Sequence, residues 1–224
     1  MDNYYARGLN AERLEEVYRT GFPRVRAYLR AEIDFVLKNI QDFESVLEVG
    51  AGYGRIMREL APHAATVTGV DISEANVAYG REYLHGCFNC ALLAMDAHEL
   101  AFDVEFDVAL CLQNGLSAIK GNPRNLAGRC LAAVKPGGMV LFSTYSPRFW
   151  DHRLAWFREQ AAKGLVGELD EAATGNGCIV CRDGFVGTTF SEEELAEVGR
   201  FSGCRFAIKE VDGASLFLIL EKPA

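Results

Sequence analysis

Short apolar runs alternate with amphipathic segments along most of the chain. Five runs have the length of buried strands, and they cover residues 45–49, 66–70, 88–94, 106–112 and 139–144. The segments between them carry helix signals, among them a capping serine at Ser73 and an Asn122-Pro123 helix start. This alternation predicts a doubly wound, Rossmann-like α/β fold with a mostly parallel sheet and helices on both faces.

Two regions lie outside this repeat. Residues 10–20 and the segment after Phe22 are predicted as helices, so residues 1–40 are expected to form an N-terminal helical cap. After the fifth strand, residues 147–187 read as a helix followed by glycine-rich loops and short strands, which indicates an insertion. Both regions are assigned to a single domain that spans residues 1–224.

The last part of the chain is expected to complete the sheet. Ser191 and Glu194 have the spacing of a capping box, which predicts the start of a helix. Residues 205–211 and 215–221 read as two strands joined by a tight hairpin at Asp212-Gly213-Ala214. We therefore expect seven strands, of which the last is antiparallel.

A glycine-rich turn, in the segment VLEVGAGYGR (46–55), follows the first strand directly. Gly50 and Gly52 remove side chains where a strand turns into a helix, so a ligand can lie against the backbone. The exposed N–H groups at such a helix start favour a polar or anionic group. Arg55 places a positive charge at the start of this helix, where it is unfavourable with the helix dipole. The negative charge that compensates it would come from Glu48, a ligand carboxylate, an anionic substrate or Glu59 at i+4.

Acidic residues follow the next two strands. Asp71, before Ile72, ends the second strand, where an acid can accept hydrogen bonds from two ribose hydroxyls. Asp96, before Ala97, could accept a hydrogen bond from an adenine amino group. Each acid has the alternative of an ordinary capping or turn role. The ligand is a nicotinamide dinucleotide or S-adenosylmethionine, and the G-x-G-x-G spacing with Glu48 favours the second, because a carboxylate repels a pyrophosphate but suits an ammonium.

Composition and charge narrow the function classes. The 224-residue chain has a formal net charge of −8, so electrostatic attraction to nucleic acid or to an anionic membrane is not expected. The N-terminus lacks a signal-peptide pattern, and a cytoplasmic protein is predicted. Seven scattered cysteines indicate reduced thiols. The pairs Cys87/Cys90 and Cys178/Cys181 have zinc-like spacing, but their expected places in the fold argue against a shared site, and no metal is predicted.

Taken together, these motifs resemble class I S-adenosylmethionine-dependent methyltransferases of the small-molecule type. VLEVGAGYGR resembles the glycine motif of the family, GVDIS (69–73) its ribose-binding segment and MDAHEL (95–100) its adenine-binding segment. FDVALCLQNGLSAI (106–119) resembles the fourth strand and the loop that faces the transferred methyl group. The final strand pair resembles the reversed hairpin that separates this family from dinucleotide dehydrogenases.

The resemblance implies methyl transfer to a small-molecule acceptor, with no nucleic-acid or membrane partner, and it is compatible with a homodimer. It places the insertion on the substrate side, where Cys178 and Cys181 stay open as pocket residues. The candidates for a catalytic role are Tyr5, Asn114 and His152. The cofactor residues implied are Glu48, Gly50, Ala51, Gly52, Asp71, Ile72, Asp96, Ala97 and Gln113.

Two other functions are retained as alternatives. A nicotinamide-dependent oxidoreductase is disfavoured by the loop spacing and by the final hairpin. A protein that binds S-adenosylmethionine without catalysing a reaction would carry the same motifs, and only an assay for turnover separates it from an enzyme.

Overall fold

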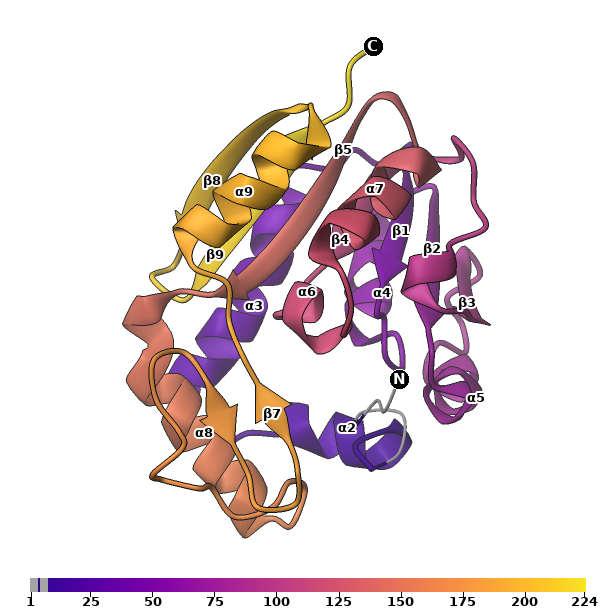
Figure 1. Cartoon of the computed structure of the whole chain (residues 1–224). Coiled ribbons are helices and arrows are strands. Elements are labelled where there is room, and N and C mark those ends of the chain that lie inside the picture. The colour runs from indigo at the N-terminus through magenta and orange to yellow at the C-terminus, as the bar shows by residue number, and fades with distance from the viewer. Residues whose placement is uncertain (1–3, 5–7) are drawn as a thin grey trace.

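A seven-stranded sheet forms the centre of the computed structural model, which describes residues 4 and 8–224 (Figure 1). The strand order is β3-β2-β1-β4-β5-β9-β8. The neighbouring strands in the part β3-β2-β1-β4-β5 pair in parallel, and β9 is antiparallel to both β5 and β8. This arrangement confirms the predicted fold and its reversed last strand. The strand bounds are β1 (Ser45–Val49), β2 (Thr66–Asp71), β3 (Cys90–Ala94), β4 (Phe106–Cys111), β5 (Val134–Tyr145), β8 (Arg205–Val211) and β9 (Ser215–Glu221).

Helices cover both faces of this sheet (Figure 1). One face carries α3 (Pro23–Leu37), α4 (Arg55–Leu60) and α5 (Glu74–Tyr83), and the other carries α6 (Gly115–Ala118), α7 (Pro123–Ala133) and α9 (Glu192–Ser202). Beyond the carboxyl ends of the parallel strands lie α2 (Ala11–Tyr18), α8 (Trp150–Ala162) and the two-stranded pair β6 (Ile179–Val180) and β7 (Val186–Gly187). Three short 3-10 helices, η1 (Ala61–His63), η2 (Ala97–Glu99) and η3 (Pro147–Phe149), connect these elements.

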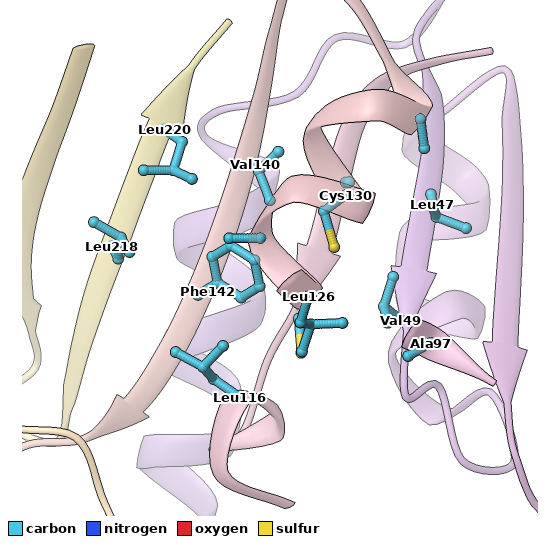
Figure 2. Packing of buried hydrophobic residues seen from close by; sticks show 14 of the residues in the cluster. Leu47, Val49, Ala97, Leu116, Leu126, Cys130, Val140, Phe142, Leu218 and Leu220 are labelled. Atoms are coloured by element: carbon cyan, nitrogen blue, oxygen red, sulfur yellow. The ribbon is translucent and has the colours of Figure 1, made fainter. Parts of the chain in front are cut away.

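Successive residues of the central strands point to opposite faces, so the sheet separates two apolar layers. Val46 of β1 packs in the layer of α3, α4 and α5, whereas Leu47 packs in the layer of α7 and α9. Figure 2 shows the second layer, where Leu126 and Cys130 of α7 lie against Phe142 of β5. Each leucine fully buried in this way contributes about 1.5–3 kcal/mol to folding, which makes the sheet a rigid support for the loops at its edge.

Local signals placed several boundaries correctly. The Ser73 hydroxyl accepts a hydrogen bond from the Asn76 amide, and Asn122 Oδ1 accepts one from the Arg124 amide, so both residues are N-caps. Ser191 begins α9 with the complete capping box. The hairpin at residues 212–214 joins β8 and β9 as predicted.

Three predicted boundaries are wrong. The third strand begins at Cys90 because residues 87–90 form a turn, and the side chain of Phe88 is fully exposed. The fifth strand begins at Val134, ahead of its glycines, because the chain runs close to β4 there: a Cβ on Gly138 would lie 2.6 Å from the Asp107 carbonyl oxygen. The helix predicted over residues 10–20 ends at Tyr18, with Arg19 as its C-cap.

The seven cysteines are free, and the two Cys-x-x-Cys pairs lie apart, one beside β3 and one around β6. Within residues 4 and 8–224, His, Cys, Asp and Glu side chains form no group of three or more suited to a metal ion. None of the helices in this part of the chain has both the length and the apolar character needed to cross a membrane.

Candidate active site

A cavity of about 570 Å³ opens at the carboxyl ends of the central strands. This volume lies within the range of about 300–1,000 Å³ that is typical of small-molecule sites. The walls come from the loop after β1, the ends of β2 and β4, η2, α2 and α8. All nine residues that the sequence assigned to the cofactor line this one cavity: Glu48, Gly50, Ala51, Gly52, Asp71, Ile72, Asp96, Ala97 and Gln113.

The glycine loop is fixed to β2 and packed against α2. The amides of Gly50 and Ala51 both donate to the Val70 carbonyl oxygen, at 2.9 and 3.0 Å. Gly52 has a φ of +56°, and a Cβ there would lie 2.9 Å from Leu14 Cδ2 of α2. Glycine is therefore favoured at this position by the left-handed backbone, and a larger residue would also have to displace the Leu14 side chain.

Asp71 is held in place by three hydrogen bonds before any ligand is considered. Its Oδ2 accepts from the Gly52 amide at 2.9 Å, and its Oδ1 accepts from the Ser73 amide at 2.9 Å and from Asn76 Nδ2 at 3.0 Å. Asn76 Oδ1 in turn accepts from the Ala11 amide at 2.7 Å, which ties α2 to the same group. Burial raises the pKa of Asp71, and these donors partly offset that effect.

Asp96 and Ala97 line the cavity at the start of η2. Asp96 Oδ1 accepts a hydrogen bond from the His98 amide at 2.8 Å, so this acid is the N-cap of η2. His98 lines the cavity as well, and its ring is fixed on both sides by Lys120 and Asn125. Asp96 therefore has the turn role considered for it in the sequence. It also lines the cavity, so it is still a candidate for binding a ligand.

Glu48 and Arg55 bring opposite charges to the base of the cavity. Glu48 is 3% exposed, and burial raises its pKa to about 8, although the Arg55 charge acts in the opposite direction. The Arg55 guanidinium lies 4.4 Å from the ring centroid of Tyr18. Glu48 Oε2 and Arg55 Nη2 are buried and have no hydrogen-bond partner among the described residues. The alternative pairing of Arg55 with Glu59 is wrong, since Glu59 pairs with Arg30 at 3.0 Å.

A second buried carboxyl group, Glu32 of α3, was missed by the sequence analysis. It is fully buried, accepts hydrogen bonds from Ser215 Oγ at 2.7 Å and from the Gln113 amide at 3.2 Å, and burial raises its pKa to about 7. Gln113 has a φ of +53°, so Glu32 supports a left-handed turn at the end of β4. The available signal was a glutamate within the apolar stripe of a helix, next to Ile33.

The three catalytic candidates are not brought together. Asn114 is buried beside the cavity but does not line it, because its amide links β5 to the segment directly after the insertion: Oδ1 accepts from Thr144 Oγ1 and Nδ2 donates to the Thr188 carbonyl oxygen, both at 2.8 Å. His152 is exposed on α8, away from the lining. Tyr5 lies outside the described residues. Cys178 and Cys181 do not line the cavity either.

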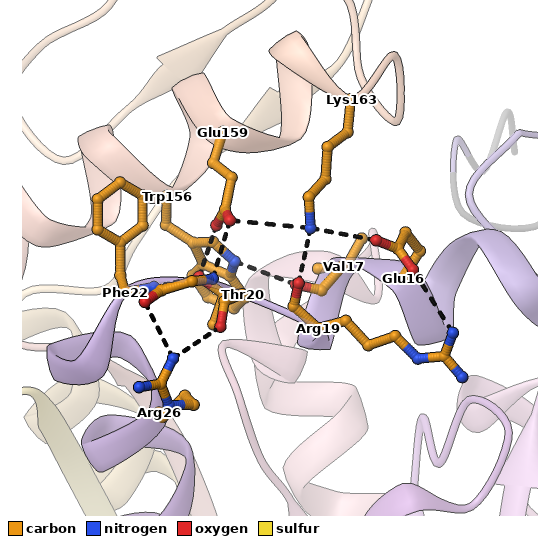
Figure 3. Close-up of polar contacts among 10 residues, drawn as sticks. Glu16, Val17, Arg19, Thr20, Phe22, Arg26, Trp156, Glu159 and Lys163 are labelled. Atoms are coloured by element: carbon orange, nitrogen blue, oxygen red, sulfur yellow. Dashed lines mark hydrogen bonds and ion pairs between the residues drawn. The ribbon is translucent and has the colours of Figure 1, made fainter.

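One wall of the cavity is made by α2 and α8, and polar contacts hold these two helices together (Figure 3). Glu159 accepts hydrogen bonds from Thr20 Oγ1 at 2.5 Å and from the Gly21 amide at 2.9 Å. Trp156 Nε1 donates to the Val17 carbonyl oxygen at 3.1 Å, and Lys163 Nζ donates to a carbonyl oxygen of the segment after α2. The periodicity of α8 was visible in the sequence, but the element that it faces was not.

Comparisons with known proteins show similarity to methyltransferases. Residues 46–138 match the family described as a methyltransferase domain. The ubiquinone biosynthesis O-methyltransferase of Hydrogenovibrio crunogenus is 30% identical over 141 residues, which are 60% of this chain and 56% of the relative. The chain therefore spans about half the length of the curated relatives that it matches.

Solved structures show the same fold over nearly the whole chain. The structure of a DhpI–SAH complex superposes with a TM-score of 0.66 at 20% identity, covering 94% of this chain and 92% of that one. N-methyltransferase NodS from Bradyrhizobium japonicum, solved with S-adenosyl-L-homocysteine, gives 0.62 at 15% identity and covers 100% of both chains. Residues 46–138 thus match a methyltransferase domain, and the fold around them, with its glycine loop and reversed last strand, is the one that the resemblance to class I S-adenosylmethionine-dependent methyltransferases implies.

Proposed function

We propose that this protein binds S-adenosylmethionine in the cavity and transfers its methyl group to a small-molecule acceptor by in-line displacement. The observation that carries the proposal is the convergence of the nine sequence-assigned residues on one cavity at the carboxyl edge of the sheet. In this proposal Asp71 accepts hydrogen bonds from the ribose hydroxyls, and Asp96 and Ala97 meet the adenine. Gly50, Ala51 and Gly52 lie along the amino-acid end of the cofactor.

The buried charges support a ligand that carries both signs. Two buried carboxyl groups, Glu32 and Glu48, lie close enough to Arg55 to feel its charge, and burial raises the pKa of both acids. A buried charge without a partner is costly, so a ligand ammonium beside Glu48 and a ligand carboxylate beside Arg55 would relieve both. A dinucleotide pyrophosphate would supply negative charge only.

When bound, S-adenosylmethionine supplies a methyl group that is already activated on a sulfonium. The tasks left to the chain are alignment of the acceptor and exclusion of water. The left-handed turn at Gln113, supported by Glu32, shapes the end of β4, while α2 and α8 close the cavity from the side. No assigned base is needed in this scheme for an acceptor that reacts through a neutral lone pair.

The same proposal covers the parts of the chain around the core. The cap (residues 1–40) and the insertion (residues 147–187) form the acceptor side of a single domain. A homodimer and a cytoplasmic location stay predictions from the sequence.

Calorimetry and an activity assay test the proposal. We expect S-adenosylmethionine and S-adenosylhomocysteine to bind and NAD not to bind. We also expect S-adenosylhomocysteine to accumulate when a panel of small metabolites is supplied. Binding of NAD in place of the adenosyl compounds would contradict the proposal, and cofactor binding without turnover on any acceptor would support the non-catalytic alternative.

A further inference from the structure

The compartment of the cavity between α2 and α8 is almost entirely apolar. Tyr18 and Trp156 provide flat aromatic surfaces there, and the Trp156 ring is fixed by its hydrogen bond to α2. Phe185 of the insertion lines the same cavity. The lining residues contributed by these two helices are Leu14, Val17, Tyr18, Trp156, Phe157 and Gln160.

Gln160 is the exception in this apolar wall. The residue is 3% exposed and lines the cavity, yet its side-chain amide makes no hydrogen bond to any residue in the described part of the chain. The amide atoms keep contact with the cavity space and are not sealed inside the protein, so they are free to hydrogen-bond a ligand there. The rotation of α8 is set by Trp156, which binds α2, and by Glu159, which binds the segment directly after α2, and this orientation keeps Gln160 directed at the cavity.

None of the described residues of α2 and α8 that line this compartment is charged. The charged lining residues come instead from the loops after the strands, as Glu48, Arg55, Asp71 and Asp96 illustrate. Lys163 of α8 is directed at α2, where it pairs with Glu16 at 3.2 Å. The cation nearest to this wall is Arg55, whose guanidinium lies over the Tyr18 ring and is assigned to the cofactor carboxylate in the proposed function. An ionised group of the acceptor between these helices would therefore lack a counter-ion of its own, which is strongly unfavourable.

We propose that this compartment binds a planar, uncharged ring of the methyl acceptor, and that the Gln160 amide is a specificity residue that hydrogen-bonds a polar substituent on the ring. The aromatic walls favour a flat ring through stacked and edge contacts. A primary amide both donates and accepts, so it suits a hydroxyl or an amide substituent. This inference rests on the proposed function, because it assumes that the rest of the cavity holds the cofactor.

Three probes that share one ring test the inference: 4-methylphenol, p-xylene and 4-methylbenzoate. Their affinities are measured by ligand-observed NMR on the full chain saturated with S-adenosylhomocysteine. The variants are Gln160→Met, which keeps the length but removes the amide, and Gln160→Asn, which retracts it. Gln41→Met removes an exposed amide and is the matched control.

We expect the wild type to prefer 4-methylphenol over p-xylene by about three- to tenfold, the effect of one neutral hydrogen bond, and to bind 4-methylbenzoate least. Gln160→Met should abolish that preference and retain p-xylene affinity within about twofold, Gln160→Asn should reduce the preference, and Gln41→Met should match the wild type. Any of three results would overturn this inference and leave the proposed function intact. These are that 4-methylbenzoate binds most tightly, that Gln160→Met keeps the preference for 4-methylphenol, or that no probe binds in the presence of S-adenosylhomocysteine. Failure of the wild type to bind S-adenosylhomocysteine would overturn the proposed function and this inference with it.

Discussion

Asp71 Oδ2 accepts a hydrogen bond from the Gly52 amide at 2.9 Å, so the acid that ends β2 is joined directly to the glycine loop that follows β1. The same carboxylate is held from the other side by the Ser73 amide and by Asn76. Its orientation toward the cavity is therefore set by the protein. A group that is oriented in advance loses little conformational freedom when a ligand binds, which increases its contribution to affinity.

The first prediction concerns Asp71. Asp71→Ala should weaken S-adenosylmethionine binding at least about tenfold, because two hydrogen bonds to a charged acceptor are lost. Isothermal titration calorimetry measures the effect, and Asp103→Ala, at an exposed acid outside the cavity, should bind as the wild type does. An unchanged affinity in Asp71→Ala would remove this residue from the site.

The second prediction concerns protons released on binding. Because the pKa of Glu48 is about 8, its carboxyl group is mostly protonated at pH 6.5. A ligand ammonium favours the ionised form, so binding should release a proton, and affinity should rise about tenfold per pH unit between pH 5.5 and 7. The binding enthalpy should then depend on the ionisation enthalpy of the buffer.

Glu48→Gln is the test of that assignment. The variant should bind S-adenosylmethionine more weakly and lose the dependence on buffer. If the variant releases protons as the wild type does, the effect arises from another group and Glu48 does not meet the ammonium.

The third prediction concerns stability and pH in the absence of ligand. The pKa of Glu32 is raised from 4.5 to about 7, so the folded state binds more protons than the unfolded state between these values. The contribution of this group to stability is therefore complete below pH 4.5 and is lost as the pH rises through 7. Urea unfolding from pH 4.5 to 8 should show a falling free energy of unfolding.

Glu32→Gln isolates this effect. The glutamine can still accept from the Gln113 amide and can donate to Ser215 Oγ, so the variant should fold. Its free energy of unfolding should decline less with pH than that of the wild type, by on the order of 3 kcal/mol over the interval, because the shift from 4.5 to about 7 is worth about 1.4 kcal/mol per pKa unit. Glu12→Gln, at an exposed acid, should leave the slope unchanged, and an equally unchanged slope in Glu32→Gln would contradict the assignment.

The fourth prediction concerns the contact between α2 and α8. Glu159→Ala removes the acceptor of two hydrogen bonds and should lower the free energy of unfolding by about 1–2 kcal/mol. The matched control is Glu171→Ala, which breaks the exposed ion pair with Arg158 and should cost no more than about 0.5 kcal/mol. Chemical denaturation compares the two, and equal losses would show that the α2–α8 contact is no stronger than a surface pair.

The alternation of strands and helices, and the place of the cofactor candidates at the edge of the sheet, followed from the sequence because both depend on short-range patterns. A parallel strand ends at the same sheet edge as its neighbours, so an acid or glycine directly after a strand is placed at that edge without further information. This rule located Asp71, Asp96 and the glycine loop. The caps at Ser73, Asn122 and Ser191 followed in the same way, since each bond spans no more than three residues.

Only the tertiary structure decided which side chains share a wall of the cavity. The Ser215–Glu32 hydrogen bond joins residues 183 positions apart, and the Thr20–Glu159 bond spans 139 positions. The sequence predicted the helix α8 but not its contact with α2, and it therefore missed Gln160. The catalytic candidate His152 is exposed on α8. Periodicity and capping depend on residues within one segment. The direction of a side chain at a site depends on how distant segments pack against one another, and the sequence alone does not show that packing.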